Sequence, residues 1–144
     1  MTGSLVPMAG SLRVLVVDDT PSIRFLIRMN LEISGHVVTE AVDGQDCLDY
    51  LEQLAVAGDA LPDVVTFDIV MPRLDGISTV ERLRGDDRFA NLGIVMVTTQ
   101  SQQVDISRAH AAGVDAYIVK PFDLDDLIET VERIAAQRRE VQGR

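Results

Sequence analysis

The chain has 144 residues and a formal net charge of −10 at pH 7, with a pI near 4.5. This length suits one domain with a single hydrophobic core. The acidic balance disfavours nucleic acid and anionic membrane surfaces as direct partners, because both need a basic face, and it suits metal cations and basic protein surfaces. Cys47 is the single cysteine, so we expect no disulfide framework and a reducing, cytoplasmic location.

The two ends of the chain carry no pattern of a folded element. Residues 1–11 lack the charged and apolar segments of a secretory signal, and we expect them to be a tail or a cloning remnant. Residues 12–139 are predicted to form the domain, and residues 140–144 a short C-terminal tail. No apolar run approaches the roughly 18 residues that would span a membrane, so no membrane partner is predicted.

Five short apolar runs rich in Val and Ile recur along the chain, at residues 12–17, 37–41, 63–68, 93–99 and 115–120. Three of these runs are almost continuously apolar, which is typical of strands covered on both faces. Segments with helical periodicity separate them. Residues 54–62 stand out as a loose link rich in Ala and Gly. The alternation predicts an α/β fold, a doubly wound parallel sheet with helices on both faces and right-handed crossovers.

Polar residues stand where the apolar runs end. They are Asp18 and Asp19 after the first run, Asp68 after the third, Thr98 and Thr99 at the end of the fourth, and Lys120 before Pro121 at the end of the fifth. In open parallel sheets, functional residues collect outside the carboxyl ends of the strands, so we expect these side chains to meet at one rim.

The residue types at this rim indicate a chemistry. Three clustered carboxylates repel one another, and one ammonium group offsets only part of their charge. A divalent cation is therefore implied, and oxygen ligands with room for water suit Mg²⁺. Mg²⁺ beside a carboxylate, with Lys and Thr side chains to hold oxygens, predicts phosphoryl transfer to an aspartate.

Lys120 is stronger evidence for a functional site than a single residue usually is. The chain has 12 Arg and one Lys, and that Lys precedes a proline at the expected site. An ammonium group is a compact point charge, whereas a guanidinium is a planar fork, so the two are not interchangeable. The choice of Lys here indicates that a point charge is needed.

Four segments, VVDD, FDIVMPRLDG, VMVTT and AYIVKPF, together resemble the receiver domain of two-component response regulators. The resemblance runs from about Leu12 to Arg139, and the spacing of Asp68 from Thr98 and Lys120 matches the family. The interval from Asp19 to Asp68 is several residues longer than usual, and residues 54–62 account for the excess. The resemblance implies a flavodoxin-like fold, with a five-stranded parallel sheet in the order 2-1-3-4-5.

The resemblance also implies a metal site and a phosphoacceptor. Asp68 would accept the phosphoryl group. Asp18, Asp19 and Asp68 would hold Mg²⁺ together with the backbone carbonyl of Val70. Lys120 would pair with Asp68 and then with the phosphoryl group.

A switch is implied at the neighbouring strands. Thr98 would hydrogen-bond a phosphoryl oxygen, and Tyr117 would turn inward as Thr98 moves. That motion would alter the face formed by the fourth helix, fifth strand and fifth helix, which would bind a downstream protein. The Lys120–Pro121 peptide bond would be cis.

Three residues beside the site are expected to tune access to it. Thr99 stands where the family usually has Ala or Gly, and its β-branched side chain is stiff. Val70 and Gln100 are uncharged, so neither can orient an attacking water as a carboxylate would. These departures predict slow loss of the phosphoryl group.

Taken singly, most of these features have simpler interpretations. An acidic pair after a strand is commonly a helix N-cap, Asp75-Gly76 is a turn, and an aromatic at position 117 can be packing. Cys47 is expected to be a core thiol, whereas His36 and His110 are expected at the surface. The arginines near the C-terminus are expected to form a solvated helix end rather than a binding patch.

The combined pattern predicts a stand-alone receiver, a switch and not an enzyme, phosphorylated by a histidine kinase or phosphotransfer protein. One alternative is a pseudo-receiver scaffold that binds partners without phosphate. Another is an aspartyl-phosphate hydrolase, but such enzymes usually place a second Asp where Val70 stands. A nucleotide or flavin binder is disfavoured, because DDTPS replaces a glycine-rich loop after the first strand.

Overall fold

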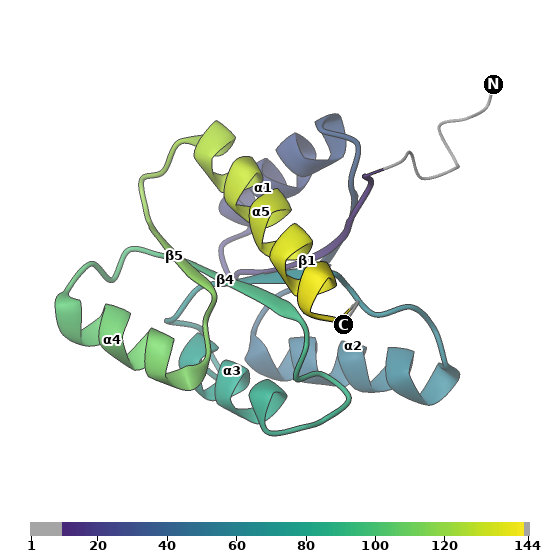
Figure 1. Ribbon diagram of the computed structural model, residues 1–144. Coiled ribbons are helices and arrows are strands. Elements are labelled where there is room, and N and C mark those ends of the chain that lie inside the picture. Colours follow the sequence, from purple (N-terminus) through teal and green to yellow (C-terminus); the bar gives the residue numbers. More distant parts are fainter. Residues whose placement is uncertain (1–9, 143–144) are drawn as a thin grey trace.

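A five-stranded parallel sheet in the order β2-β1-β3-β4-β5 forms the middle layer of the structure, a computed structural model that describes residues 10–142 (Figure 1). The strands are β1 Arg13–Val17, β2 Val37–Ala41, β3 Val64–Phe67, β4 Gly93–Thr98 and β5 Ala116–Val119. The helices are α1 Pro21–Ile33, α2 Gly44–Ala57, α3 Gly76–Arg84, α4 Gln103–Ala112 and α5 Leu124–Gln142. The predicted doubly wound fold and strand order are confirmed.

Helices cover both faces of the sheet, with α1 and α5 on one side and α2, α3 and α4 on the other (Figure 1). Successive strand residues therefore enter different cores. Leu15 and Val17 of β1 belong to the core beneath α2, α3 and α4, whereas Val14 and Val16 belong to the core beneath α1 and α5. A strand buried on both faces has no polar side, which explains the continuous apolar runs.

The link predicted at residues 54–62 is shorter than expected. Its first four residues, Leu54–Ala57, form the end of α2, and Leu54 and Ala55 pack against the core. Leu and Ala are strong helix formers, so the helix continues until Gly58 adopts a left-handed conformation with φ of 72°. Cys47 on the same helix is buried, as predicted, and burial raises the pKa of its thiol.

The prediction for His36 is wrong, because its side chain is only 3% exposed. The backbone N–H of Leu12 donates to Nδ1 at 3.1 Å, so the proton lies on Nε2, which donates to Glu132 Oε2 at 2.8 Å. The imidazole thereby joins the starts of β1 and β2 to α5. His110 is exposed, as expected.

The C-terminal arginines are not simply solvated. Arg138 donates to Asp115 Oδ1 at 2.6 Å, and Arg84 donates to Asp115 Oδ2 at 3.0 Å. Arg139 lies 3.8 Å from Asp63. The helix also continues through residues 140–142, which were expected to be tail. Among the described residues, no helix is long and apolar enough to cross a membrane.

The Asp75-Gly76 pair is more than a turn. Asp75 is the N-cap of α3, and its carboxylate accepts from the Ser78 N–H at 2.8 Å. Gly76 donates its N–H to the Ile69 carbonyl at 2.8 Å. A Cβ atom on Gly76 would lie 2.1 Å from the carbonyl oxygen of Asp68, so only glycine lets α3 begin this close to the residue after β3.

We predict that Gly76→Ala lowers the free energy of unfolding by about 1–3 kcal/mol, because the added methyl group displaces Asp68 or α3. Urea denaturation measures this change. Gly85→Ala is the matched control at the other end of α3, where a Cβ atom would lie 3.4 Å from its nearest neighbour. Equal losses in both variants would contradict the steric explanation.

Candidate functional site

Asp18, Asp19 and Asp68 come together at the carboxyl ends of two adjacent strands. Val17 of β1 pairs with Phe67 of β3, so the residues that follow these strands are neighbours. Carboxylate oxygens of the three aspartates lie within 4.8 Å of one another. The cluster follows directly from the parallel register, because each chain segment leaves the sheet at the same rim.

Lys120 bridges two of these carboxylates from the end of β5. Its Nζ atom lies 2.8 Å from Asp18 Oδ2 and 3.0 Å from Asp68 Oδ2. Burial alone lowers the pKa of Lys120, but the hydrogen bonds that Lys120 donates to Asp18 and Asp68 outweigh that effect and leave the pKa raised. The ammonium group therefore stays charged. A pair of Lys120 with Asp68 was expected, and the structure adds Asp18 as a second partner.

Backbone groups fix the orientation of both bridged aspartates. The Thr20 N–H donates to Asp18 Oδ1 at 2.9 Å, and the Ile69 N–H donates to Asp68 Oδ1 at 2.7 Å. The N-cap of α1 is Thr20, without a side-chain capping bond. The simpler interpretation of the acidic pair as a helix cap therefore does not describe Asp19, which is exposed at the rim.

The donor set fits a hard divalent cation. Three carboxylates and one ammonium group leave a formal charge of −2, and all the candidate ligand atoms are oxygens. Mg²⁺ prefers such ligands and retains several waters, for which exposed Asp19 leaves room. Asp18, Asp19 and Asp68 are thus the residues that would hold the ion.

Thr98 and Thr99 occupy the end of β4 in different environments. Thr98 is fully buried, and its hydroxyl oxygen accepts from the Gln100 N–H at 3.3 Å. Thr99 is exposed and lines a cavity of about 600 Å³ together with Asp19, Asp68 and Lys120. Thr98 is therefore the last residue of the strand, whereas Thr99 follows the strand and lines the hollow beside Asp19 and Asp68.

The rest of this cavity wall is mainly apolar. Its residues come from α1, from the loop after β3, from the loop after β5 and from the start of α5, namely Ile23, Leu26, Val70, Pro121, Phe122 and Leu124. The Lys120–Pro121 peptide bond is cis. Asp68 thus lies in the wall of a hollow that is mainly apolar.

Tyr117 connects β5 to the segment after β4. Its hydroxyl donates to the carbonyl of Gln100, and its side chain is partly buried against the core. Burial raises the pKa of Tyr117, and the charges of Asp105 and Asp68 raise it further. The tyrosine therefore combines packing with a hydrogen bond to the loop that begins at Thr99.

Arg73 and Asp43 hold the loop after Asp68 from the side, and sequence analysis selected neither. Arg73 donates from Nε to Asp43 Oδ2 at 2.7 Å and from Nη2 to Asp43 Oδ1 at 3.0 Å. Arg73 has a φ of 65°, the only positive value among the described non-glycine residues. Such a conformation carries no signal in the sequence, and the partners lie 30 residues apart.

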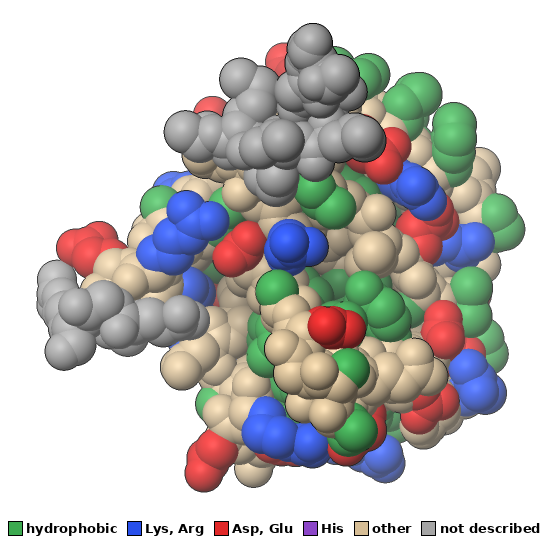
Figure 2. Space-filling model, turned by 90° about the vertical axis from the view of Figure 1, so that its right-hand side faces the viewer, with side chains coloured by type: hydrophobic (Ala, Val, Ile, Leu, Met, Phe, Trp, Pro, Cys, Tyr) green, Lys and Arg blue, Asp and Glu red, His purple; other side chains and the backbone are tan. Residues whose placement is uncertain are grey.

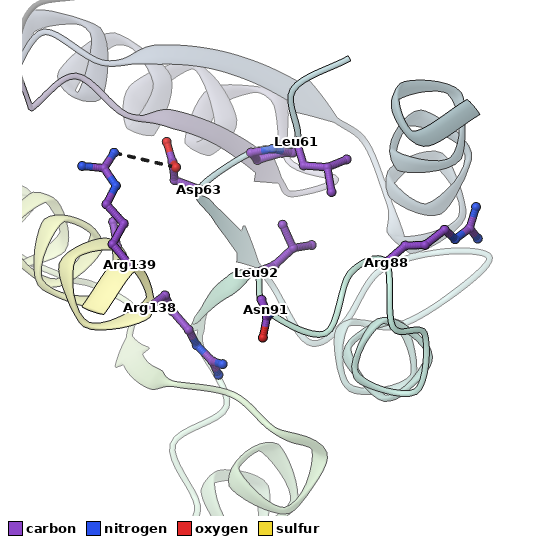
Figure 3. A pocket seen from close by; sticks show the side chains of 9 residues that line it. Leu61, Asp63, Arg88, Asn91, Leu92, Arg138 and Arg139 are labelled. Atoms are coloured by element: carbon purple, nitrogen blue, oxygen red, sulfur yellow. Dashed lines mark ion pairs between the residues drawn. The ribbon is translucent and has the colours of Figure 1, made fainter. Parts of the chain in front are cut away.

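A second hollow, of about 280 Å³, lies at the other end of the strands, where β3 and β4 begin. Its wall includes Asp63, Arg88, Arg138 and Arg139. Arg139 points toward Asp63, whereas the guanidinium of Arg88 points away from the other two arginines (Figure 3). On the side of the molecule where β1 begins, basic and acidic side chains stand next to one another (Figure 2). These arginines are paired with carboxylates and do not converge on a ligand.

Comparison with known proteins agrees with the site geometry. Residues 14–132 match the family model of the response regulator receiver domain. The chain is 34% identical to protein PilH of Pseudomonas aeruginosa over 124 residues, covering 86% of this chain and 98% of PilH. It is also 34% identical to RpaA of Synechocystis sp., a DNA-binding transcriptional regulator, covering 85% of this chain and 48% of RpaA. The chain therefore spans about half the length of some of its relatives.

Solved structures show the same likeness. The chemotaxis protein CheY4 of Vibrio cholerae matches with a TM-score of 0.77 and 30% identity, over 86% of this chain and 98% of CheY4. A response regulator from Chloroflexus aurantiacus matches with a TM-score of 0.80 and 27% identity, over 88% of this chain and 98% of that one. By its family match, its relatives and its fold, this chain belongs to the receiver domains of two-component response regulators.

Proposed function

We propose that this receiver is a switch that accepts a phosphoryl group on Asp68, with Mg²⁺, from a histidine kinase or phosphotransfer protein. The observation that carries the proposal is the convergence of Asp18, Asp19 and Asp68 within 4.8 Å, with Lys120 bonded to two of them. This arrangement supplies a nucleophilic carboxylate, ligands for a cation and a fixed positive charge at one rim.

The transfer can be written from these groups. A carboxylate oxygen of Asp68 attacks the phosphorus atom of a phosphohistidine, and the P–O bond forms as the P–N bond breaks. The imidazole leaves with the electron pair and takes up a proton. When bound, Mg²⁺ supplies positive charge against the phosphoryl oxygens. Lys120 is already oriented by Asp18, so its ammonium group stabilises the transferred charge without first having to be positioned.

The phosphodonor would reach Asp68 through the apolar hollow. Its protein must cover the rim of that hollow, where Ile23 and Leu26 of α1 lie. Helix α1 also exposes Phe25, Met29 and Ile33, spaced four residues apart on one side of the helix. We propose this apolar side of α1 as the docking surface for the protein that carries the phosphohistidine.

The conformational response to phosphorylation would pass through β4 and β5. Thr98 would bond the phosphoryl group and Tyr117, which already contacts Gln100, would respond. A population shift between two arrangements of these residues would change the α4-β5-α5 face, where we place the downstream protein partner. Val104 of α4 and Val119 of β5 are exposed on these elements. A cytoplasmic location is part of the same proposal.

The two alternative functions, a hydrolase and a scaffold that works without phosphate, explain fewer of the residues at this rim. A hydrolase would need a group that activates water, and exposed Val70 offers none at its position. A scaffold that binds partners without phosphate would have no use for Lys120, held between two carboxylates. Both rivals make a clear prediction, namely that no stable acyl phosphate forms on Asp68.

We predict that Asp68→Asn keeps the fold but abolishes labelling by acetyl phosphate with Mg²⁺, because an amide is not a nucleophile here. Intact mass spectrometry detects the phosphoryl adduct on the wild type and its absence in the variant. Asp59→Asn, in the exposed loop after α2, is the matched control and should label normally. A Mg²⁺-dependent adduct on the Asp68 variant would refute the assignment.

We predict that Asp19→Ala weakens Mg²⁺ binding roughly tenfold or more, which corresponds to ~1.4 kcal/mol. The physical reason is that two carboxylates hold a strongly hydrated ion less well than three. Isothermal titration with MgCl₂ measures the dissociation constant, and Asp59→Ala serves as the exposed control. An unchanged constant for the Asp19 variant would mean that this carboxylate is not a ligand.

We predict that the acyl phosphate decays slowly in the wild type and about tenfold faster in Thr99→Ala, a change of ~1.4 kcal/mol in the barrier. Thr99 lines the hollow together with Asp68, and shortening its side chain would open a path for water and for the donor. Val70 and Gln100 offer no carboxylate to direct that water.

Phosphoprotein decay after removal of the donor is the measurement for this prediction. Thr39→Ala, at an exposed threonine in the middle of β2, is the matched control and should decay like the wild type. Decay of the wild type within seconds, or equal decay of the Thr99 variant, would show that this side chain does not limit access.

A further inference from the structure

The loop after Asp68 reaches across to the start of α2, an element that contributes no candidate ligand. We infer that the ion pair between Arg73 and Asp43 positions this loop, and with it the backbone of Val70, for Mg²⁺ binding. The inference rests on the proposed function and deepens it, because it names residues that act on the metal site through the loop.

The loop is already fixed at both of its ends. The Asp68 N–H donates to the Val17 carbonyl at 3.2 Å, which holds the end of β3. At the other end, Gly76 donates to the Ile69 carbonyl at 2.8 Å and lies against Asp68. Residues 70–75 therefore form a closed lobe, which Met71 anchors in the core on one side and contacts at its middle hold on the other.

Arg73 stands in the middle of this lobe in an unfavourable conformation. Its φ of 65° places it in the left-handed region, which is unfavourable for a residue other than glycine. Such backbone strain persists only where the surroundings impose it. Two charge-assisted hydrogen bonds to one carboxylate, at 2.7 and 3.0 Å, are the contacts that do so.

Asp43 is well suited to be the fixed partner. It is the N-cap of α2, and its Oδ1 atom also accepts from the Asp46 N–H at 2.8 Å. Its side chain is 4% exposed, compared with 56% for Arg73. The hydrogen bond from Arg73, and secondarily the one from Asp46, hold the pKa of Asp43 below its usual value despite burial. The Asp43 carboxylate is thus a charged, buried partner for the exposed guanidinium of Arg73.

A second contact ties the same two segments. Gly44 donates its N–H to the Leu74 carbonyl at 3.2 Å, and a Cβ atom on Gly44 would lie 2.6 Å from that oxygen. The start of α2 therefore contacts the lobe at two successive residues, Arg73 and Leu74. Because the lobe also carries Val70, displacing its middle would move the proposed carbonyl ligand.

A double-mutant cycle tests the inference. Arg73→Ala removes the guanidinium, and Asp43→Asn removes the charge while keeping an oxygen for the Asp46 N–H. We expect each variant to weaken Mg²⁺ binding about three- to tenfold and to slow labelling by acetyl phosphate. The double variant should bind Mg²⁺ no more weakly than the single variant with the larger loss. The reason is that both changes remove the same interaction.

A second readout does not require the metal. In the metal-free protein, amide hydrogen exchange at Leu74 and Gly76 should become at least about tenfold faster in both single variants, because the lobe opens more often. Arg88→Ala is the matched control, since Arg88 is also an exposed arginine bonded to carboxylates, Glu52 and Asp86, away from the lobe. It should alter neither the Mg²⁺ dissociation constant nor these exchange rates.

Arg73→Gly guards against a variant that simply fails to fold, because glycine relieves the left-handed strain while losing the ion pair. It should fold at least as well as Arg73→Ala and still bind Mg²⁺ more weakly than the wild type. Wild-type Mg²⁺ affinity in a folded Arg73 variant, or additive losses in the double variant, would overturn the positioning role alone. A wild type that neither binds Mg²⁺ nor accepts a phosphoryl group would overturn the proposed function as well.

Discussion

Mutual repulsion among three carboxylates is the constraint on which the arrangement of this rim depends. Lys120 relieves part of that repulsion by bonding Asp18 and Asp68 at once, and both bonded oxygens are largely screened from solvent. The remaining formal charge of the cluster is negative, so the rim favours a cation and then a group rich in oxygens. Charge balance thus links the ammonium group of Lys120 to the proposed binding of a cation and a phosphoryl group in a single site.

Geometry supplies what charge alone does not. The parallel register of β1 and β3 places Asp18 beside Asp68, and the order of the sheet brings β4 and β5 to the same rim. Close backbone approaches then set the positions of the loops, at Gly76 against Asp68 and at Gly44 against Leu74. The arrangement of the site therefore depends on Gly76 and Gly44 as well as on its charged side chains.

The sequence predicted the fold, and most site residues could be selected because each one follows directly after an apolar run. Lys120 stood out through composition, and Asp68 through its place at the end of a strand. The contacts that could not be predicted join residues distant in the chain, such as Arg73 with Asp43 and His36 with Glu132. Each partner looks like an ordinary surface residue by itself, and only the tertiary structure brings the pair together.

The single lysine of the chain has a consequence for spectroscopy. Because the chain contains one Lys, protein grown with isotopically labelled lysine carries one labelled side chain, and that side chain lies between Asp18 and Asp68. Its resonance would be free of overlap from other lysines. The chemical shift of one ammonium group would therefore report any change in the charge of the two carboxylates beside it.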